Sequence, residues 1–255
     1  MCTKIFYKKA VDVALTAVGL CGVMLLFCSP MALADENASN PLAAVKNTDV
    51  RAKYFDLDPG NRKDYYIDGA TMLNPKLKLK YELHYWDTNI TGKDEKDWES
   101  ASAKLIYFAK EGKLKGDRPY RLAVGGEWIK DLGDTDKGIG TGADQIAPLV
   151  GLAMGVRPGT MLIPLVQHFE GYSGDDYSTT SARLIGIQSL PDQAWFKLDL
   201  KVPYDWENDT VPASIELQLG KSFSPSFGAY VDLQSGLGGD KPYETAAGVG
   251  LRFSY

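Results

Sequence analysis

The chain has 255 residues, of which 44% are hydrophobic and 24% are charged, with a net charge of −5. This composition is too apolar and too varied for a disordered or collagen-like protein. The acidic balance excludes nucleic acid as a partner, because nucleic-acid binding requires a positively charged surface.

The first 34 residues have the pattern of a secretory signal peptide. A basic start is followed by an apolar stretch over 13–28 and by the small residues Ala32 and Ala34, which form a cleavage site. The alternative is an uncleaved N-terminal membrane helix, since the apolar stretch is near the lower limit for a span. All three cysteines lie in this segment, so the rest of the chain has no disulfide and no cysteine metal site.

Beyond the signal segment, no apolar run approaches the length of a helical span, which excludes a multi-helix membrane protein. Hydrophobic and polar residues instead alternate with a period of two. In 77–86, leucine and tyrosine alternate with lysine, glutamate and histidine, and 243–255 repeats the pattern. Because successive side chains of a strand point to opposite faces, each such segment is predicted to be a strand with one apolar face.

The alternation predicts twelve strands of the length that a tilted strand needs to cross a bilayer. Their expected ranges are 48–56, 64–73, 76–87, 98–110, 119–131, 144–156, 159–169, 177–190, 194–204, 211–221, 227–234 and 243–255. The run 159–169 is apolar on both faces, which leaves its orientation open.

The connections between these strands alternate in length. Short connections are expected at 74–75, 157–158, 190–193 and 222–226, and long ones at 57–63, 88–97, 132–143, 170–176, 205–210 and 235–242. Acidic residues outnumber basic ones in the long connections, whereas the opposite rim is more basic. The connection 111–118 breaks the rule, because it is long where a short one is expected.

Together these features predict an all-β fold, a single antiparallel transmembrane β-barrel with short periplasmic turns and longer acidic extracellular loops. Residues 35–47 are expected to form a periplasmic N-terminal segment, which is either a disordered tail or folds up into the lumen. Residues 48–255 are expected to form the outer-membrane barrel. The alternative is a soluble β-sandwich or lipocalin-like barrel, whose apolar face points inward. The aromatic C-terminal strand favours the membrane form.

Charged residues on the alternating strands must point into the lumen, because a lysine or arginine facing lipid costs about 2–4 kcal/mol near the midplane. They either pair with one another and fill the lumen or line a narrow aqueous path. The predicted lumen-lining residues are Lys78, Lys80, Glu82, His84, Arg121, Glu127, Arg183, Lys197, Asp199, Lys201, Glu216 and Arg252.

Aromatic residues near the strand ends are expected to mark the membrane interfaces. They are Tyr54, Phe55, Tyr65, Tyr66, Tyr85, Trp86, Trp98, Tyr120, Trp128, Trp195, Tyr204, Trp206, Tyr243 and Tyr255.

Four segments, 40–45, 77–86, 164–169 and 201–206, resemble outer-membrane proteins grouped with the MetA-pathway of phenol degradation, some of which carry the label neuromedin U. The resemblance extends over most of the chain after the signal segment. It implies an outer-membrane transporter, and it carries no catalytic signature and no established functional residues.

The sequence predicts no catalytic residues, no cofactor and no metal site. We expect a channel or transporter for small molecules. An outer-membrane enzyme of the lipase type, with His168 as the plausible base, and a surface-binding barrel without transport are the alternatives. The expected partners are outer-membrane lipids and lipopolysaccharide, the barrel-assembly machinery through the C-terminal strand, and a small-molecule solute that the sequence does not name.

Overall fold

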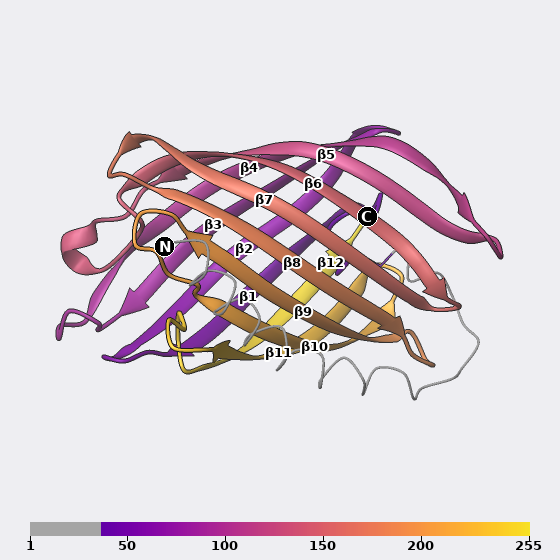
Figure 1. Cartoon of the computed structure of the whole chain (residues 1–255). Coiled ribbons are helices and arrows are strands. Elements are labelled where there is room, and N and C mark those ends of the chain that lie inside the picture. Colours follow the sequence, from indigo (N-terminus) through magenta and orange to yellow (C-terminus); the bar gives the residue numbers. More distant parts are fainter. Residues whose placement is uncertain (1–36) are drawn as a thin grey trace.

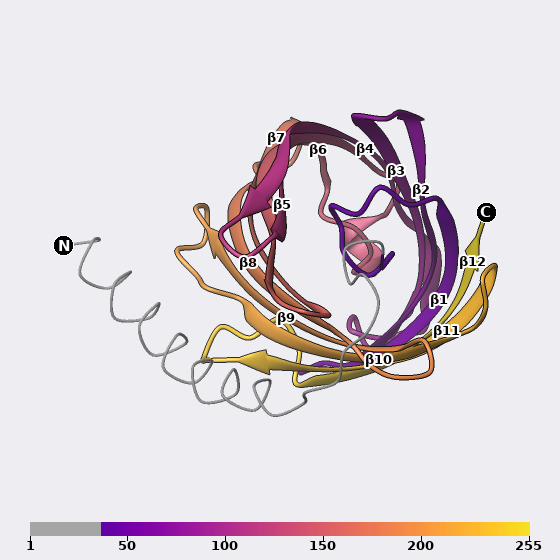
Figure 2. The ribbon, with the colours of Figure 1, turned by 90° about the vertical axis from the view of Figure 1, so that its right-hand side faces the viewer.

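A computed structural model describes residues 37–255, which form a closed barrel of twelve strands, each antiparallel to both of its neighbours (Figures 1 and 2). The predicted all-β barrel is confirmed. The signal peptide predicted for 1–34 lies outside the described residues. Within 37–255, helices capable of crossing a membrane are absent.

The strands lie close to their predicted positions and follow the chain order around the barrel. Their bounds are β1 Asn47–Asp56, β2 Asn61–Asn74, β3 Leu77–Thr88, β4 Glu95–Leu114, β5 Arg118–Asp131, β6 Ala143–Arg157, β7 Thr160–Gly174, β8 Ser178–Ser189, β9 Ala194–Asp205, β10 Ala213–Ser224, β11 Phe227–Leu237 and β12 Thr245–Ser254.

The first and last strands close the barrel. β1 pairs with β12 without interruption from Asn47 opposite Ser254 to Asp56 opposite Thr245. Closure leaves no open sheet edge along the wall, and this is the condition for placing a sheet in hydrocarbon, where unpaired backbone groups cost several kcal/mol.

The two rims differ in the length of their connections. At the rim where β1 begins and β12 ends, here the terminal rim, the strands are joined over 75–76, 115–117, 158–159, 190–193 and 225–226. At the opposite rim, the loop rim, the connections include 132–142, which contains a short turn of 3-10 helix, η3 (Thr135–Lys137).

Three predicted connections are corrected. The long connection expected at 111–118 is a three-residue turn, because β4 and β5 continue beyond their predicted ends. The loops expected at 57–63 and 170–176 shrink to 57–60 and 175–177, because β2 begins earlier and β7 ends later than their patterns suggested. Polar strand ends that project beyond the bilayer lack the apolar alternation, so the sequence pattern stops before the strand does.

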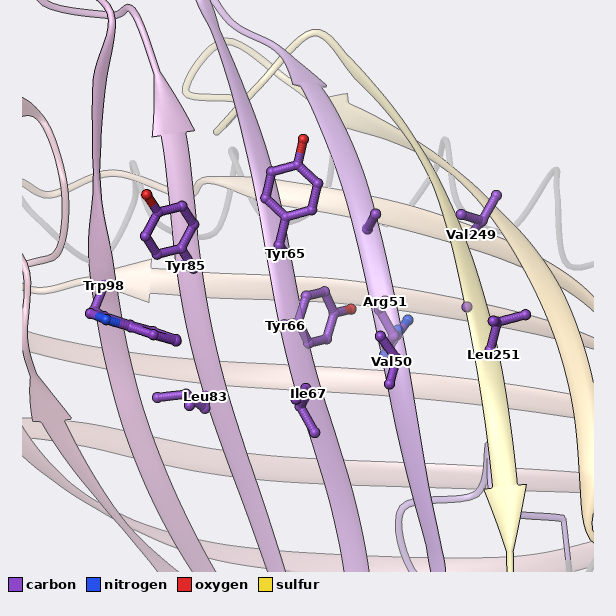
Figure 3. A pocket seen from close by; sticks show the side chains of 12 residues that line it. Val50, Arg51, Tyr65, Tyr66, Ile67, Leu83, Tyr85, Trp98, Val249 and Leu251 are labelled. Atoms are coloured by element: carbon purple, nitrogen blue, oxygen red, sulfur yellow. The ribbon is translucent and has the colours of Figure 1, made fainter.

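Apolar side chains lie on the outside of the barrel and charged ones on the inside. Large apolar residues on the outer face are about half exposed, among them Val50, Leu105, Val124, Val150, Val166, Leu219, Val231 and Val249. An apolar hollow of about 490 Å³ lies on the outside of β1–β4 and β12. Val50, Tyr65 and Ile67 are among the residues that line it (Figure 3). This arrangement is the reverse of a soluble barrel and fits a lipid environment.

Residues 37–46 lie inside the barrel, where Figure 2 shows the indigo segment before β1 within the ring of strands. We call 37–46 the inner segment. Asn40, Leu42 and Ala43 are fully buried, and β1 begins directly afterwards at Asn47. The disordered tail expected within 35–47 is therefore wrong for these residues, and the alternative of a segment folded into the lumen is correct.

The inner segment packs against an apolar part of the lumen wall. Leu42 belongs to a buried cluster with Ile106, Phe108, Ala123, Ala153, Met161, Ile163, Ile185 and Ile187, which come from β4 to β8. This cluster explains why the run 159–169 is apolar on both faces: one face of β7 meets lipid, and the other meets Leu42. We call this side of the lumen the apolar wall.

Candidate functional site

The remaining lumen is a charged cavity of about 390 Å³ between the inner segment and the loop rim. It is lined mainly by β1, β2, β3, β9 and β10, so the lumen has one charged side and one apolar wall. Its acidic lining residues are Asp64, Asp68, Glu82, Asp199 and Glu216. Its lysines and arginines are Arg51, Lys53, Arg62, Lys80, Arg183, Lys197, Lys201 and Arg252.

Glu216 and Asp199 each contact more than one cation. The carboxylate of Glu216 lies 2.9 Å from Lys53 Nζ and 2.5 Å from Lys197 Nζ. Asp199 contacts Arg183 and lies 3.9 Å from Lys197. Both carboxylates are almost completely buried, so these pairs are stable only because each charge is compensated.

A second group of charges surrounds His84. Its Nδ1 lies 3.0 Å from Asp64, its Nε2 lies 3.5 Å from Glu82, and its ring stacks on Tyr66 with centroids 4.5 Å apart. Lys80 lies 3.5 Å from Glu82. These contacts hold the imidazole in a network of lumen charges, and none of them supplies a hydroxyl nucleophile.

Two predicted lumen residues bind the backbone of the inner segment. Lys78 Nζ donates hydrogen bonds to the carbonyl oxygens of Pro41 at 3.2 Å and Ala43 at 2.7 Å. Arg121 Nη1 donates to the carbonyl oxygen of Leu42 at 2.8 Å. These donors satisfy backbone carbonyls that the strand ladder does not reach.

At the edge of the inner segment, Arg252 Nη1 lies 3.2 Å from Ser39 Oγ. Ser39 Oγ in turn donates to Gln218 at 2.6 Å. Asp49 pairs with Arg252 through Nη2 at 2.7 Å and accepts a hydrogen bond from Tyr230 at 2.7 Å. This buried group joins β1, β10, β11 and β12 to the inner segment.

Small residues on β12 provide space for the charged side chains. A Cβ on Gly250 would lie 2.2 Å from the Tyr230 ring, and one on Gly248 would lie 2.6 Å from Lys53 Cγ. Both glycines face the lumen, because they lie opposite Arg51 and Lys53 in the register of β1 and β12.

All twelve predicted lumen residues lie on the inner face of the barrel, but they serve different groups. Glu127 is separate from the others named above, since it pairs with Lys104 at 2.8 Å and accepts from Gln167 at 2.7 Å. Lys78 and Arg121 bind the inner segment, and the other nine predicted residues line the charged cavity.

The sequence analysis missed the inward charges of β1 and β2. They are Arg51, Lys53, Arg62, Asp64 and Asp68. The signal was present in β1, where Arg51 and Lys53 alternate with Val50, Ala52 and Tyr54, whereas Arg62 and Asp64 of β2 flank the charged residue Lys63. The interface prediction is wrong for Phe55, Tyr66 and Trp195, which are buried on the inner side, whereas Tyr65, Trp98 and Trp128 are exposed on the outside.

His168 lies on the outer face of β7 close to the loop rim. Its Nδ1 is 2.9 Å from Thr180 Oγ1, and its Nε2 is 3.3 Å from Glu170. Thr180 Oγ1 also accepts a hydrogen bond from Trp206 Nε1 at 2.9 Å. A hydroxyl, an imidazole and a carboxylate therefore lie in sequence on the surface. Over 37–255, no group of three metal-binding side chains is gathered.

The chain matches no family model and no curated protein. Solved structures of similar shape are an outer membrane channel from Pseudomonas putida F1 (TM-score 0.61, 9% identity, 88% of this chain and 100% of that one) and the NanC porin (0.60, 9%, 82% and 98%). A Salmonella typhi outer membrane phospholipase, solved as a dimer with bound calcium, is also similar (0.55, 15%, 87% and 98%). The fold is therefore the one that these outer-membrane channels and the outer-membrane phospholipase share.

Proposed function

We propose that this protein is a passive outer-membrane channel for small polar molecules, with a lumen narrowed by the inner segment. The observation that carries the proposal is the relation between two hollows. The charged cavity on the loop side and a hollow of about 540 Å³ at the terminal rim are both lined by Ala38 and Arg252. The proposed route across the membrane runs beside the inner segment, where Ala38 and Arg252 lie between the two hollows.

The charges along this route favour the passage of polar solutes. A low-dielectric wall lined with fixed charges of both signs attracts and orients ions and polar molecules, whereas an apolar solute gains nothing there. The apolar wall is already covered by Leu42, so the open volume lies on the charged side.

Planar-bilayer recordings of the purified protein test this function. We expect discrete conductance steps, a reversal potential in a salt gradient, and a shift of that potential when Lys80→Glu inverts one lumen charge. The heat-denatured protein is the control. The absence of steps from correctly folded protein, together with no solute uptake into liposomes, would contradict the proposal.

A second candidate function is favoured by the contacts of His168 alone. The order Thr180, His168, Glu170 is that of a nucleophile, a general base and an orienting acid on a lipid-exposed surface. Phospholipid hydrolysis in mixed micelles tests it. Hydrolysis that is lost in both Thr180→Val and His168→Ala supports an enzyme, and hydrolysis that is absent or unchanged by these variants refutes it.

A further inference from the structure

Within residues 37–255, two cations of the charged cavity, Lys201 and Arg62, form no direct ion pair with a carboxylate. Each of the other six lining lysines and arginines forms an ion pair, for example Lys53 with Glu216. Among the described residues, neither Lys201 nor Arg62 lies within 4.0 Å of a carboxylate oxygen. A charge in a low-dielectric lumen is costly unless it is compensated, so the two positions require an explanation.

The surroundings of Lys201 increase this cost. Lys201 on β9 lies directly opposite Arg183 on β8, and both side chains face the lumen. Like charges directly opposite each other in a sheet are destabilising. Arg183 contacts Asp199, a carboxylate that also serves Lys197, which leaves Lys201 beside a carboxylate that is already shared.

Arg62 is held in place by aromatic rings and not by a direct ion pair within the described residues. Its guanidinium lies 4.0 Å from the Trp86 ring and 4.4 Å from the Phe55 ring, and its buried Nε has no hydrogen-bond partner. Ring contacts orient the guanidinium and leave its positive charge in the cavity. Arg62 is therefore a fixed cation that lines the same cavity as Lys201.

We propose that the charged cavity binds a small organic anion, a dicarboxylate, through Lys201 and Arg62. This inference rests on the proposed channel function and names the solute class of that channel. A cavity of about 390 Å³ is within the size range of small-ligand sites. Two unpaired cations in one cavity of this size favour two carboxylates over one, and lining rings such as Tyr66 favour an organic anion over phosphate.

Binding is measured with the folded protein in detergent, so that it is independent of conduction. Succinate, acetate and inorganic phosphate are each titrated into the protein, and the heat of binding and the melting temperature of the protein are measured. We expect succinate to bind more tightly than acetate or phosphate and to raise the melting temperature, because a ligand that binds only the folded state stabilises it. Lys201→Gln should weaken succinate binding about tenfold or more, through loss of a charge-assisted contact.

The matched control is Lys63→Gln, which removes the same charge from the outer face of β2 next to Arg62. This variant should bind succinate like the wild type. Without ligand, Lys201→Gln should be at least as stable as the wild type, because it relieves the repulsion with Arg183. Arg62→Gln, checked for folding by its heat-modifiable mobility, should weaken binding as Lys201→Gln does.

The outcomes separate the site from the channel. Succinate binding that depends on Lys201, in a protein that does not conduct, supports the site and contradicts the channel. Conductance without succinate binding, or succinate binding unchanged in Lys201→Gln, overturns the site and leaves the channel. Tighter binding of phosphate than of succinate also overturns the proposal that the ligand is a dicarboxylate.

Discussion

The ammonium of Lys78 lies 2.7 Å from the carbonyl oxygen of Ala43, so that a strand residue predicted to line the lumen holds the inner segment there. The side chain of Lys78 is among the largest of the fully buried ones. Its role depends on the backbone that it binds, and this relationship leads to the first two predictions.

Lys78→Met should loosen the inner segment. The carbonyl oxygens of Pro41 and Ala43 lose their donor, and an unsatisfied buried acceptor costs about 1–3 kcal/mol. The population of the state in which the inner segment is displaced should rise about fivefold or more over the wild type. Single-channel recording detects this change as longer or larger openings. The control is Lys76→Met in the exposed turn 75–76, and equal conductance in both variants contradicts the role of Lys78.

Leu42→Ala should release the inner segment from the apolar wall. Replacement of a buried leucine by alanine costs about 2–5 kcal/mol, and here the loss acts on the short inner segment. We expect proteinase K to cut within 37–46 faster than in the wild type, with the barrel left intact. Leu73→Ala, at an exposed position on β2, should leave the cleavage rate unchanged, and slow cleavage of Leu42→Ala would show that Leu42 is not the anchor.

Most of the wall was predictable from the sequence, because a strand between lipid and lumen must alternate in polarity. The cations of β1, Arg51 and Lys53, also follow that rule, whereas Arg62 of β2 stands in a polar run without alternation. The inner segment was not predictable, since it has no periodicity, and the side chains that hold it, such as Lys78 on the carbonyl oxygen of Ala43, come from distant strands. The division of the lumen required the barrel register, which brings the inner residues of β4 to β8 onto Leu42.

Asp199→Asn should destabilise the barrel strongly. The substitution leaves Arg183 and Lys197 beside a neutral amide, and removal of one partner of a buried ion pair costs about 3–5 kcal/mol. Asp117→Asn is the control, because Asp117 pairs with Lys113 in an exposed turn, where such a pair contributes less than about 1 kcal/mol. Urea unfolding in detergent compares them, and equal midpoints would contradict the assigned role of Asp199.

Gly250→Val should disturb the lumen side of β12. The new side chain occupies the space of the Tyr230 ring, which a Cβ at this position would approach to 2.2 Å. Overpacking of this kind costs about 1–3 kcal/mol and should separate Tyr230 from Asp49. Gly239→Val, in a loop with open space around it, should melt at the wild-type temperature. A melting temperature for Gly250→Val equal to that of the wild type would show that the ring moves without cost.

The apolar wall also determines which part of the lumen can hold water. Isoleucine and alanine side chains covered by Leu42 offer an ion no replacement for its hydration shell. In the proposed channel, permeating ions must therefore travel off the barrel axis, along the side of the lumen formed by β1 to β3 and β9 to β12. The electrical resistance of the pore is then governed by one half of its circumference, and substitutions of equal size on the two halves should differ in their effect on current.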